Sequence, residues 1–162
     1  AVISGLRASS KDLVFYTEGD MQYHLDELPL LWQLMTSDIN FVNGIRLKRS
    51  DKLSRIIIGE FYNKLVRLAF LMPIYDFDCA YRLIRKPLMK NLNFKIKSGA
   101  LNVELIKKAQ RNGASFRQVS IHHYDRVYGS SQFFRVGRIL ETLLDLSRLW
   151  IELMIVDRLP KS

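Results

Sequence analysis

The stretch Leu13-Val14-Phe15-Tyr16-Thr17-Glu18-Gly19-Asp20-Met21-Gln22 joins a short run of strand-forming residues to two carboxylates directly behind it. The apolar and aromatic residues at its start favour a β-strand, and Gly19 favours a turn after it. Glu18 and Asp20 lie one residue apart at the strand end, where two carboxylates can share a hard divalent cation that also contacts substrate phosphates. An ordinary polar turn would have the same composition. The stretch predicts a strand that ends at a candidate metal site.

Strand-like and helix-like segments alternate along the rest of the chain, which predicts an α/β fold. A long helical pattern stops at Pro73, and another helix is followed by the C-capping pair Asn112-Gly113. The long pattern has an apolar stripe that consists of Leu53, Ile56, Ile57, Phe61, Leu65, Leu68 and Ala69. The first strand is followed by one that Gly44 is expected to close. The predicted strands are 12–16, 39–43, 81–84 and 116–121, and the predicted helices are 25–35, 53–72, 102–110 and 132–159, with a helical start before residue 8.

The whole chain has 162 residues, with 25 Lys and Arg against 16 Asp and Glu, so its net charge is +9. This length suits one domain, or one domain with an appended helix, and 48% apolar residues exclude a mostly disordered chain. A single cysteine, Cys79, excludes a disulfide framework and a cysteine-based zinc cluster. The positive charge predicts an anionic partner, which can be nucleic acid, a phosphorylated substrate or an acidic membrane surface.

Basic residues gather in two groups, each of which follows the end of a predicted strand. Such groups are commonly solvated faces, but α/β domains place ligands at strand ends, which favours a phosphate-binding role. The two groups are Arg46, Lys48, Arg49, Lys52 and Arg55, and Arg82, Arg85, Lys86, Lys90, Lys95 and Lys97.

The segment 132–159 shows the clearest helical periodicity in the sequence. Its charged residues recur every three or four positions and form one narrow polar stripe, while apolar residues cover the rest. The charges interrupt every window of about 18 residues, so the segment is not a spanning helix. A wide apolar face is typical of a helix in the membrane interface, and equally of a helix packed on a core or on a partner helix.

Further candidate residues lie in the second half of the chain. Asp76 and Asp78 run into a strand that carries Arg82, which indicates either a base with an anion clamp or a salt-bridge network. Glu104 lies near a helix start, where a carboxylate can simply complement the helix dipole. The adjacent His122-His123 pair would point to opposite faces of a strand, which makes a zinc site an unfavourable interpretation.

Taken together and in this order, these segments resemble family 2 glycosyltransferases, most closely the dolichyl- and polyprenyl-phosphate sugar synthases. Residues 17–22 resemble the T-D-G-D-x-Q metal motif of that family, 42–46 its V-x-G-x-R and 76–85 its D-x-D-C-x-F-K-L-F-R. Residues 102–105 resemble N-T-E-L, and 122–131 resemble H-H-Y-P-R-x-x-G-S-S. The resemblance extends over nearly the whole chain.

The resemblance implies a partial GT-A fold over residues 1–131, which is a Rossmann-like α/β fold, followed by an amphipathic interfacial helix and tail over 132–162. It implies a transferase that moves a sugar from a nucleotide-diphospho-sugar to a polyprenyl phosphate, peripheral to the cytoplasmic side of a membrane. Nucleic acid is not an expected partner. The alternative from another class is a non-catalytic basic module that binds anionic lipid or nucleic acid.

The resemblance also assigns roles to individual residues. Glu18 and Asp20 are expected to hold Mg²⁺ or Mn²⁺, and Asp76, Asp78 and Glu104 to be catalytic or to line the sugar or acceptor pocket. The residues expected to bind substrate or phosphate are Gln22, Arg46, Arg82, Arg126 and Ser131.

Three departures from the family pattern accompany these matches. Glu18 stands where the family has Asp, and Asp125 stands where it has Pro. The βαβ unit that holds the nucleobase and ribose in the family is expected before Ala1, so the chain alone is expected to be inactive.

Overall fold

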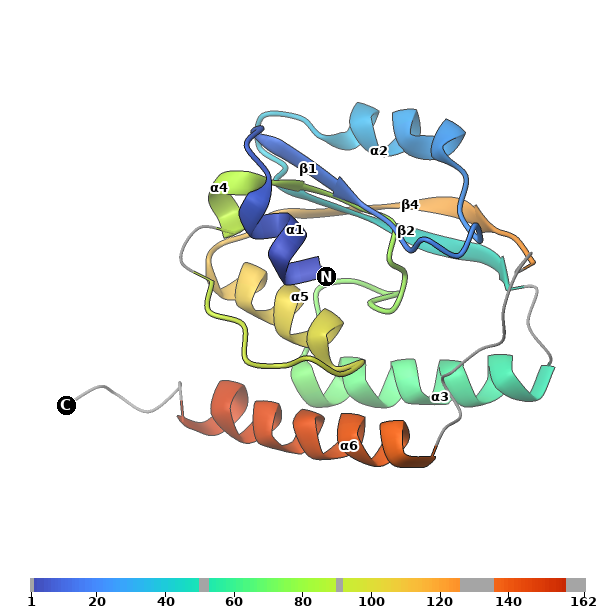
Figure 1. Cartoon of the computed structure of the whole chain (residues 1–162), viewed down its shortest axis with the longest axis vertical. Coiled ribbons are helices and arrows are strands. Elements are labelled where there is room, and N and C mark those ends of the chain that lie inside the picture. Colours follow the sequence, from blue (N-terminus) through green and yellow to red (C-terminus); the bar gives the residue numbers. More distant parts are fainter. Residues whose placement is uncertain (1, 50–52, 90–91, 126–135, 157–162) are drawn as a thin grey trace.

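In the part of the chain that the structure describes, four strands form one mixed sheet in the order β1-β3-β2-β4. A computed structural model describes residues 2–49, 53–89, 92–125 and 136–156 (Figure 1). The strands are β1 (Leu13–Tyr16), β2 (Phe41–Arg49), β3 (Arg82–Arg85) and β4 (Phe116–His123). β3 runs antiparallel to β1 and β2, whereas β2 and β4 are parallel. The carboxyl ends of β1, β2 and β4 therefore meet at one end of the sheet, together with the start of β3.

Helices cover the two faces of the sheet (Figure 1). A short η1 (Leu25–Glu27) and α2 (Leu28–Leu34) lie on one face. The helices on the opposite face are α1 (Val2–Ala8), α5 (Leu101–Arg111), and beyond them α3 (Leu53–Phe70) and α6 (Val136–Trp150). A single turn, α4 (Lys86–Met89), follows β3, and the π-helical η2 (Ile151–Ile155) continues α6. The alternation of strands and helices confirms the predicted α/β class.

Two apolar clusters fill the space between the sheet and these helices. Successive side chains of a strand point to opposite faces, so Phe41 enters the larger cluster and Val42 the smaller one. The larger cluster also contains Ile106 of α5, and the smaller one contains Leu31 of α2.

β2 is longer than the sequence predicts, because it continues through Gly44 to Arg49. The prediction that Gly44 closes the strand is wrong. A Cβ atom at Gly44 would lie 2.7 Å from Cδ1 and 2.9 Å from Cγ1 of Ile121 on β4, and 3.1 Å from Sγ of Cys79. Glycine is therefore required by the close approach of the neighbouring strand rather than by a turn.

α3 packs on the core through a different face from the one that the apolar pattern marks. Tyr62, Val66 and Phe70, each four residues apart, contact the larger cluster. Most of the predicted apolar stripe lies on the outer side of the helix instead, where Phe61 is 70% exposed. The periodicity identified an apolar side of the helix but not what that side contacts.

α6 uses two sides as well. Leu146, Leu149 and Leu153 of η2 enter the larger core cluster, so part of the C-terminal segment packs on the domain. Another set of apolar side chains, including Leu140 and Leu144, stays exposed. One side of the helix therefore packs on the core, which is one of the two interpretations of the sequence, and the other side is exposed.

Candidate functional site

Most of the predicted site residues gather at the end of the sheet where β1, β2 and β4 finish and β3 begins. The segment 17–22 follows β1, the segment 76–81 leads into β3, and residues 124–125 follow β4. Arg46 lies in the second half of β2, opposite Ile121 of β4. The mixed sheet thus brings together residues that are far apart in the sequence, as expected for a ligand site in an α/β fold.

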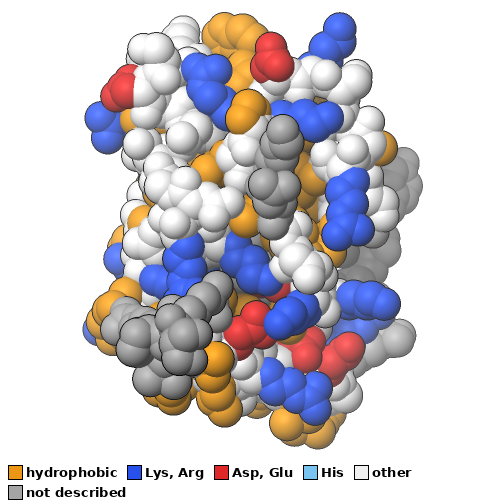
Figure 2. Space-filling model, turned by 90° about the vertical axis from the view of Figure 1, so that its left-hand side faces the viewer, with side chains coloured by type: hydrophobic (Ala, Val, Ile, Leu, Met, Phe, Trp, Pro, Cys, Tyr) orange, Lys and Arg blue, Asp and Glu red, His pale blue; other side chains and the backbone are white. Residues whose placement is uncertain are grey.

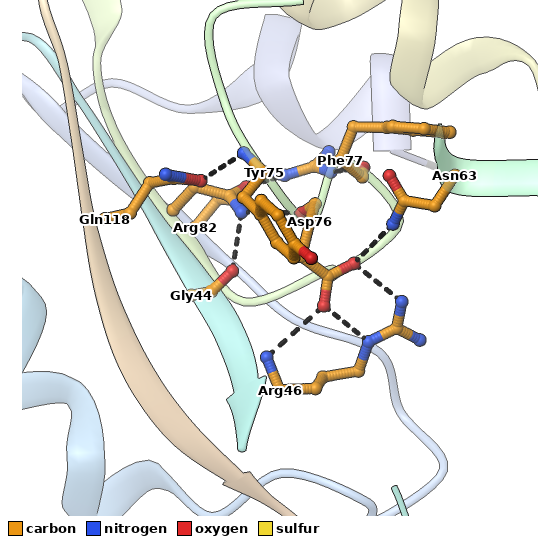
Figure 3. A network of polar contacts seen from close by, with 9 residues as sticks. Gly44, Arg46, Asn63, Tyr75, Asp76, Phe77, Arg82 and Gln118 are labelled. Carbon is orange, nitrogen blue, oxygen red and sulfur yellow. Dashed lines mark hydrogen bonds and ion pairs between the residues drawn. The ribbon is translucent and has the colours of Figure 1, made fainter. Parts of the chain in front are cut away.

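The centre of this site is an ion pair between Arg46 and Asp76 (Figure 3). Arg46 donates through Nη2 to Oδ1 at 2.6 Å and through Nε to Oδ2 at 2.7 Å, and its backbone N–H reaches Oδ2 at 3.2 Å. Asn63 of α3 donates to Oδ1 at 3.4 Å from the other side of the carboxylate. This bidentate geometry fixes the guanidinium plane more firmly than a single contact would.

The surroundings of this pair hold Arg46 in its charged form. Burial by itself lowers the pKa of Arg46, but the hydrogen bonds and charge of Asp76 outweigh burial and raise it above the ordinary value. The charge of Asp78 acts in the same direction. Since the bonds to Asp76 use Nε and Nη2, the Nη1 side of the guanidinium can donate to a second anion, such as a phosphate.

Asp78 lies close to Tyr62 of α3 as well as to Arg46. The pKa of Tyr62 is raised, first by burial and then by the charge of Asp78. The tyrosine therefore remains a neutral hydroxyl beside the carboxylate. Asp78 is less buried than Asp76, which makes it the more accessible of the two predicted carboxylates.

Arg82 is fully buried and holds the site from inside the protein. Its Nε donates to Oδ1 of Asn43 at 2.6 Å, and its Nη1 donates to Oδ1 of Asn102 at 2.8 Å and to the hydroxyl of Tyr16. Its Nη2 donates to the carbonyl of Phe77, between the two candidate aspartates. Through these contacts, Arg82 holds the 76–78 segment in place.

Asn43 is a site residue that the sequence reasoning missed. Its Nδ2 donates to the backbone carbonyl of Asp76 at 2.9 Å, while its Oδ1 accepts from Arg82. It lies inside the stretch 42–46 that resembles V-x-G-x-R, so position within that motif was the available signal. Asn63 had no such signal, because it lies in a long helix outside every stretch that resembles the family.

Glu104 is buried and bonds to a different part of the fold from the Arg46–Asp76 pair. Its carboxylate accepts from the backbone N–H groups of Lys95 and Ile96, at 2.9 Å each, and from Nζ of Lys108 at 2.5 Å. The side chain is fully buried. In this structure, Glu104 holds the 95–96 segment against α5.

The segment 17–22 is tied to the end of β4. Nε2 of Gln22 donates to the carbonyl of Tyr124 at 3.1 Å, and the backbone N–H of Tyr124 donates to the carbonyl of Gln22 at 2.9 Å. Asp20 Oδ1 accepts from the backbone N–H of Gln22 at 3.2 Å, while Glu18 is exposed. Arg126 and Ser131 lie outside the described residues.

These residues fit a divalent cation only together with a phosphorylated ligand. Glu18 and Asp20 provide two hard oxygen donors, and one or two carboxylates with substrate phosphates are an ordinary set for Mg²⁺. In the described ranges, no group of three or more His, Cys, Asp or Glu side chains is arranged to hold a metal ion. The remaining ligands would thus have to be phosphate oxygens and water.

The histidines form a separate aromatic group beside the site. His24 stacks on Tyr124 with ring centroids 4.0 Å apart, and Nδ1 of His122 lies 2.6 Å from Oε1 of Glu27. His122 is exposed and His123 is buried against Tyr23, which confirms that the two adjacent histidines point to opposite faces.

Solved structures of one enzyme share this fold. Glucosyl-3-phosphoglycerate synthase from Mycobacterium tuberculosis in complex with uridine diphosphate matches with a TM-score of 0.60 and 16% identity, over 91% of this chain and 51% of that one. Another structure of the synthase matches with a TM-score of 0.57 and 19% identity, over 100% and 55% of the two chains. The synthase has also been crystallised with Mn²⁺ or Mg²⁺ and uridine diphosphate. The chain therefore has the fold of GT-A nucleotide-sugar transferases, as predicted, and represents about half of such a structure.

Curated sequences point to a more particular relationship. Undecaprenyl-phosphate 4-deoxy-4-formamido-L-arabinose transferase from Yersinia pestis (strain Pestoides F) is 23% identical over 147 residues, which are 90% of this chain and 43% of the relative. The same enzyme from Yersinia pseudotuberculosis (serotype O:3, strain YPIII) matches equally well. No family model matches the chain. The chain spans less than half the length of these relatives, and the similarity confirms its resemblance to part of a family 2 glycosyltransferase.

Proposed function

We propose that the chain is the acceptor-side part of a glycosyltransferase that moves a sugar from a nucleotide-diphospho-sugar to a polyprenyl phosphate. The proposal places the reaction at the cytoplasmic surface of a membrane, with α6 as the peripheral contact. The observation that carries it is the Arg46–Asp76 pair at the end of the sheet where the segments 17–22 and 124–125 also meet. This arrangement offers a fixed cation for a phosphate beside carboxylates suited to a metal–diphosphate.

The chemistry requires one bond to form and one to break at the anomeric carbon of the sugar. An oxygen of the acceptor phosphate bonds to that carbon, and the bond from the carbon to the diphosphate oxygen breaks with its electrons on the leaving group. Arg46 would hold a phosphate oxygen through Nη1 while Asp76 keeps the guanidinium oriented. A divalent cation on Glu18 and Asp20, when bound, would neutralise charge that develops on the diphosphate.

The other predicted residues receive supporting roles in this proposal. Asp78 would face the sugar or the acceptor, since it is less buried than Asp76. Arg82 and Glu104 would act as positioning residues, because their bonds hold the 76–78 and 95–96 segments. Gln22 would keep the metal-binding segment against the end of β4 through its bonds to Tyr124. Arg126 and Ser131 would bind the acceptor phosphate, as the resemblance implies.

The outer edge of β1 supports the expectation that a nucleotide-binding part is needed. The backbone N–H of Lys86 donates to the carbonyl of Asp12 at 2.7 Å, so these two residues form a hydrogen-bonded pair of the β1–β3 ladder. Hydrogen-bonded and non-bonded pairs alternate along an antiparallel ladder, and the backbone N–H and C=O groups of Leu13 and Phe15 therefore point away from β3. No strand of the described ranges pairs with that edge.

The side chains of β1 are those of an interior strand. They pack against apolar clusters on both faces of the sheet, and the strand contains no charge and no proline. Edge strands of natural sheets commonly carry charged residues or proline, which protect them from pairing with another strand. We propose that a strand of the nucleotide-binding part pairs here, which would place its carboxyl end beside Glu18 and Asp20.

Complementation tests the proposed function. The full chain would be mixed with a separately expressed fragment of the Yersinia pestis relative. This fragment is the part of the relative that precedes the stretch similar to this chain. With Mg²⁺, a nucleotide sugar and polyprenyl phosphate, the mixture is expected to release nucleoside diphosphate, and the chain alone is not. Absence of release with every nucleotide sugar, together with tight and salt-sensitive binding of nucleic acid, would favour the non-catalytic basic module instead.

A further inference from the structure

α3 and α6 each carry a row of large apolar side chains that are exposed on the outer side of the helix. Isolated exposed apolar residues are normal, but a contiguous surface of this kind marks an interaction site. The exposed members on α3 are Leu53, Ile57, Ile58, Phe61, Leu65 and Leu68, and those on α6 and η2 are Val136, Leu140, Leu143, Leu144, Ile151 and Ile155. We call these twelve residues the outer apolar surface.

The two helices lie side by side on the same side of the molecule, away from the sheet (Figure 1). Nε1 of Trp150 at the end of α6 donates to the carbonyl of Ala69 on α3 at 2.9 Å, which joins the helices directly. Figure 2 shows orange side chains along the lower rim of the molecule and charged side chains above them. None of the helices in the described ranges has the length and apolar content that crossing a membrane requires.

α3 connects this surface to the candidate site. Its inner side carries Asn63, which donates to the carboxylate of Asp76, and Tyr62, whose pKa responds to Asp78. Phe61 and Leu65 lie on its outer side, 70% and 56% exposed. A helix with its side chains is about 10 Å wide, so a partner on the outer side lies roughly that distance from the Arg46–Asp76 pair.

Charge distinguishes between the two occupants that suit an apolar surface. A second copy of this chain would bring another +9 of net charge close to the first, which opposes association. An anionic lipid surface attracts the same charge, and the described parts of the two helices carry the exposed basic residues Lys64, Arg138 and Arg148. Apolar rows bordered by basic residues are typical of helices that lie in the membrane interface.

We infer that α3 and α6 together form one lipid-binding surface, with α3 as the helix that sets the distance between the lipid and the phosphate-binding site. This inference rests on the proposed function for the identity of the acceptor, and extends it from α6 to a second helix. The headgroups of the lipid surface would lie one helix width, roughly 10 Å, from the Arg46–Asp76 pair. A polyprenyl chain could then stay in the membrane while its phosphate reaches Arg46.

Binding to vesicles tests this inference without the reaction. The full chain would be floated with phosphatidylcholine vesicles and with vesicles that contain 30% phosphatidylglycerol, in the absence of nucleotide sugar and polyprenyl phosphate. The α3 variant carries Phe61→Gln and Leu65→Gln, and the α6 variant carries Leu140→Gln and Leu144→Gln. The matched control carries Leu25→Gln and Trp32→Gln, which are similarly exposed but belong to the opposite side of the sheet.

Each paired variant removes two apolar anchors, and we expect both to lower partitioning into anionic vesicles by at least about tenfold. The control is expected to bind like the unmodified chain. Unchanged binding of the α3 variant beside lost binding of the α6 variant would overturn the role of α3. A different result would assign the surface to a second copy of the chain. In that case the unmodified chain does not bind vesicles and is a dimer in analytical ultracentrifugation, and only the α3 and α6 variants are monomers.

Failure of the proposed function would leave a different result. Vesicle binding that depends on α3 and α6, without any sugar transfer by the complemented chain, would retain the lipid surface and reject the transferase. Transfer to an acceptor in detergent, without any vesicle binding, would retain the transferase and reject the lipid surface.

Discussion

The Arg46–Asp76 pair shows how one buried contact can serve both stability and a ligand site. Both side chains are about nine-tenths buried, at 10% and 8% exposure. Desolvation of two charges largely cancels their attraction, so such a pair contributes little net stability, whereas the loss of one partner leaves an uncompensated charge. Its value here is the fixed direction that Asp76 gives to the guanidinium.

A double-mutant cycle measures this coupling. Arg46→Met and Asp76→Leu should each lower the free energy of unfolding by about 3 kcal/mol, because each leaves a buried charge unpaired. The double variant should be clearly more stable than the sum of the two losses predicts. It should still not bind phosphate, because it lacks Arg46. Urea unfolding gives the three values, and strict additivity would show that the two charges are not coupled.

Glu104 is a residue whose contacts favour a positioning role over a direct chemical one. Glu104→Gln keeps the shape but loses charge-assisted bonds to two backbone N–H groups and Lys108, so we expect a loss of about 1–3 kcal/mol. Proteolysis should increase within residues 92–98. Glu152→Gln is the matched control, since its surface pair with Lys95 at 2.8 Å should contribute below about 1 kcal/mol. Equal losses from both substitutions would contradict this account.

Cys79 gives the protein a defined response to alkaline pH. Burial, followed by the charge of Asp76, raises the pKa of the Cys79 thiol from 9.0 to about 12. The unfolded chain ionises this thiol above pH 9 while the native state keeps the proton, so stability falls as pH rises from about 9 to 12.

The alkaline slope of stability checks this prediction. Between pH 9 and 11, Cys79→Ala should lose stability less steeply than the unmodified chain, by about 1.4 kcal/mol per pH unit. At pH 8, the native thiol should react with a disulfide reagent only after denaturation. Rapid reaction of the native protein would show that the thiol is accessible.

At the scale of elements, the sequence was informative about existence and poor about contacts. Helix 53–72 and strand 116–121 were found because their periodicity and capping residues are local signals. The true length of β2 was missed because Gly44 looks like a chain breaker unless Ile121 of the neighbouring strand is already in place. The outward face of α3 was missed because periodicity does not say which side meets the core.

The contact between α3 and α6 has a direct test. Trp150→Phe removes the bond from Nε1 to the carbonyl of Ala69, and we expect it to lower the free energy of unfolding by about 1 kcal/mol. Trp32→Phe provides the matched control, because the chain has only two tryptophans and Trp32 is 61% exposed on α2. Comparable losses in the two variants would argue against a specific link between the helices.

At the scale of the whole molecule, the site depends on how the sheet orders its strands. The motifs indicated which residues to consider, and the mixed sheet then placed Arg46 of β2 against Asp76, thirty residues later in the chain. Asn63 could not be predicted as a partner of Asp76, since nothing local in the sequence marks a contact between a helix and a distant turn, whereas Asn43 was marked only by its place in the stretch 42–46. In the proposed function, the charge of +9 would serve phosphates and an anionic lipid surface.

Sugar transfer itself tests the central claim most directly. The chain, complemented with the N-terminal part of the Yersinia pestis relative, would be incubated with Mn²⁺, a nucleotide sugar and vesicles that contain polyprenyl phosphate, and the lipid would be analysed by mass spectrometry. We predict a polyprenyl-phosphate sugar with the unmodified chain and at least a hundredfold less with Asp20→Ala, a loss of about 3 kcal/mol in transition-state stabilisation. Equal amounts of product with Asp20→Ala, or no glycosylated lipid from a complemented chain that binds both substrates, would contradict the account.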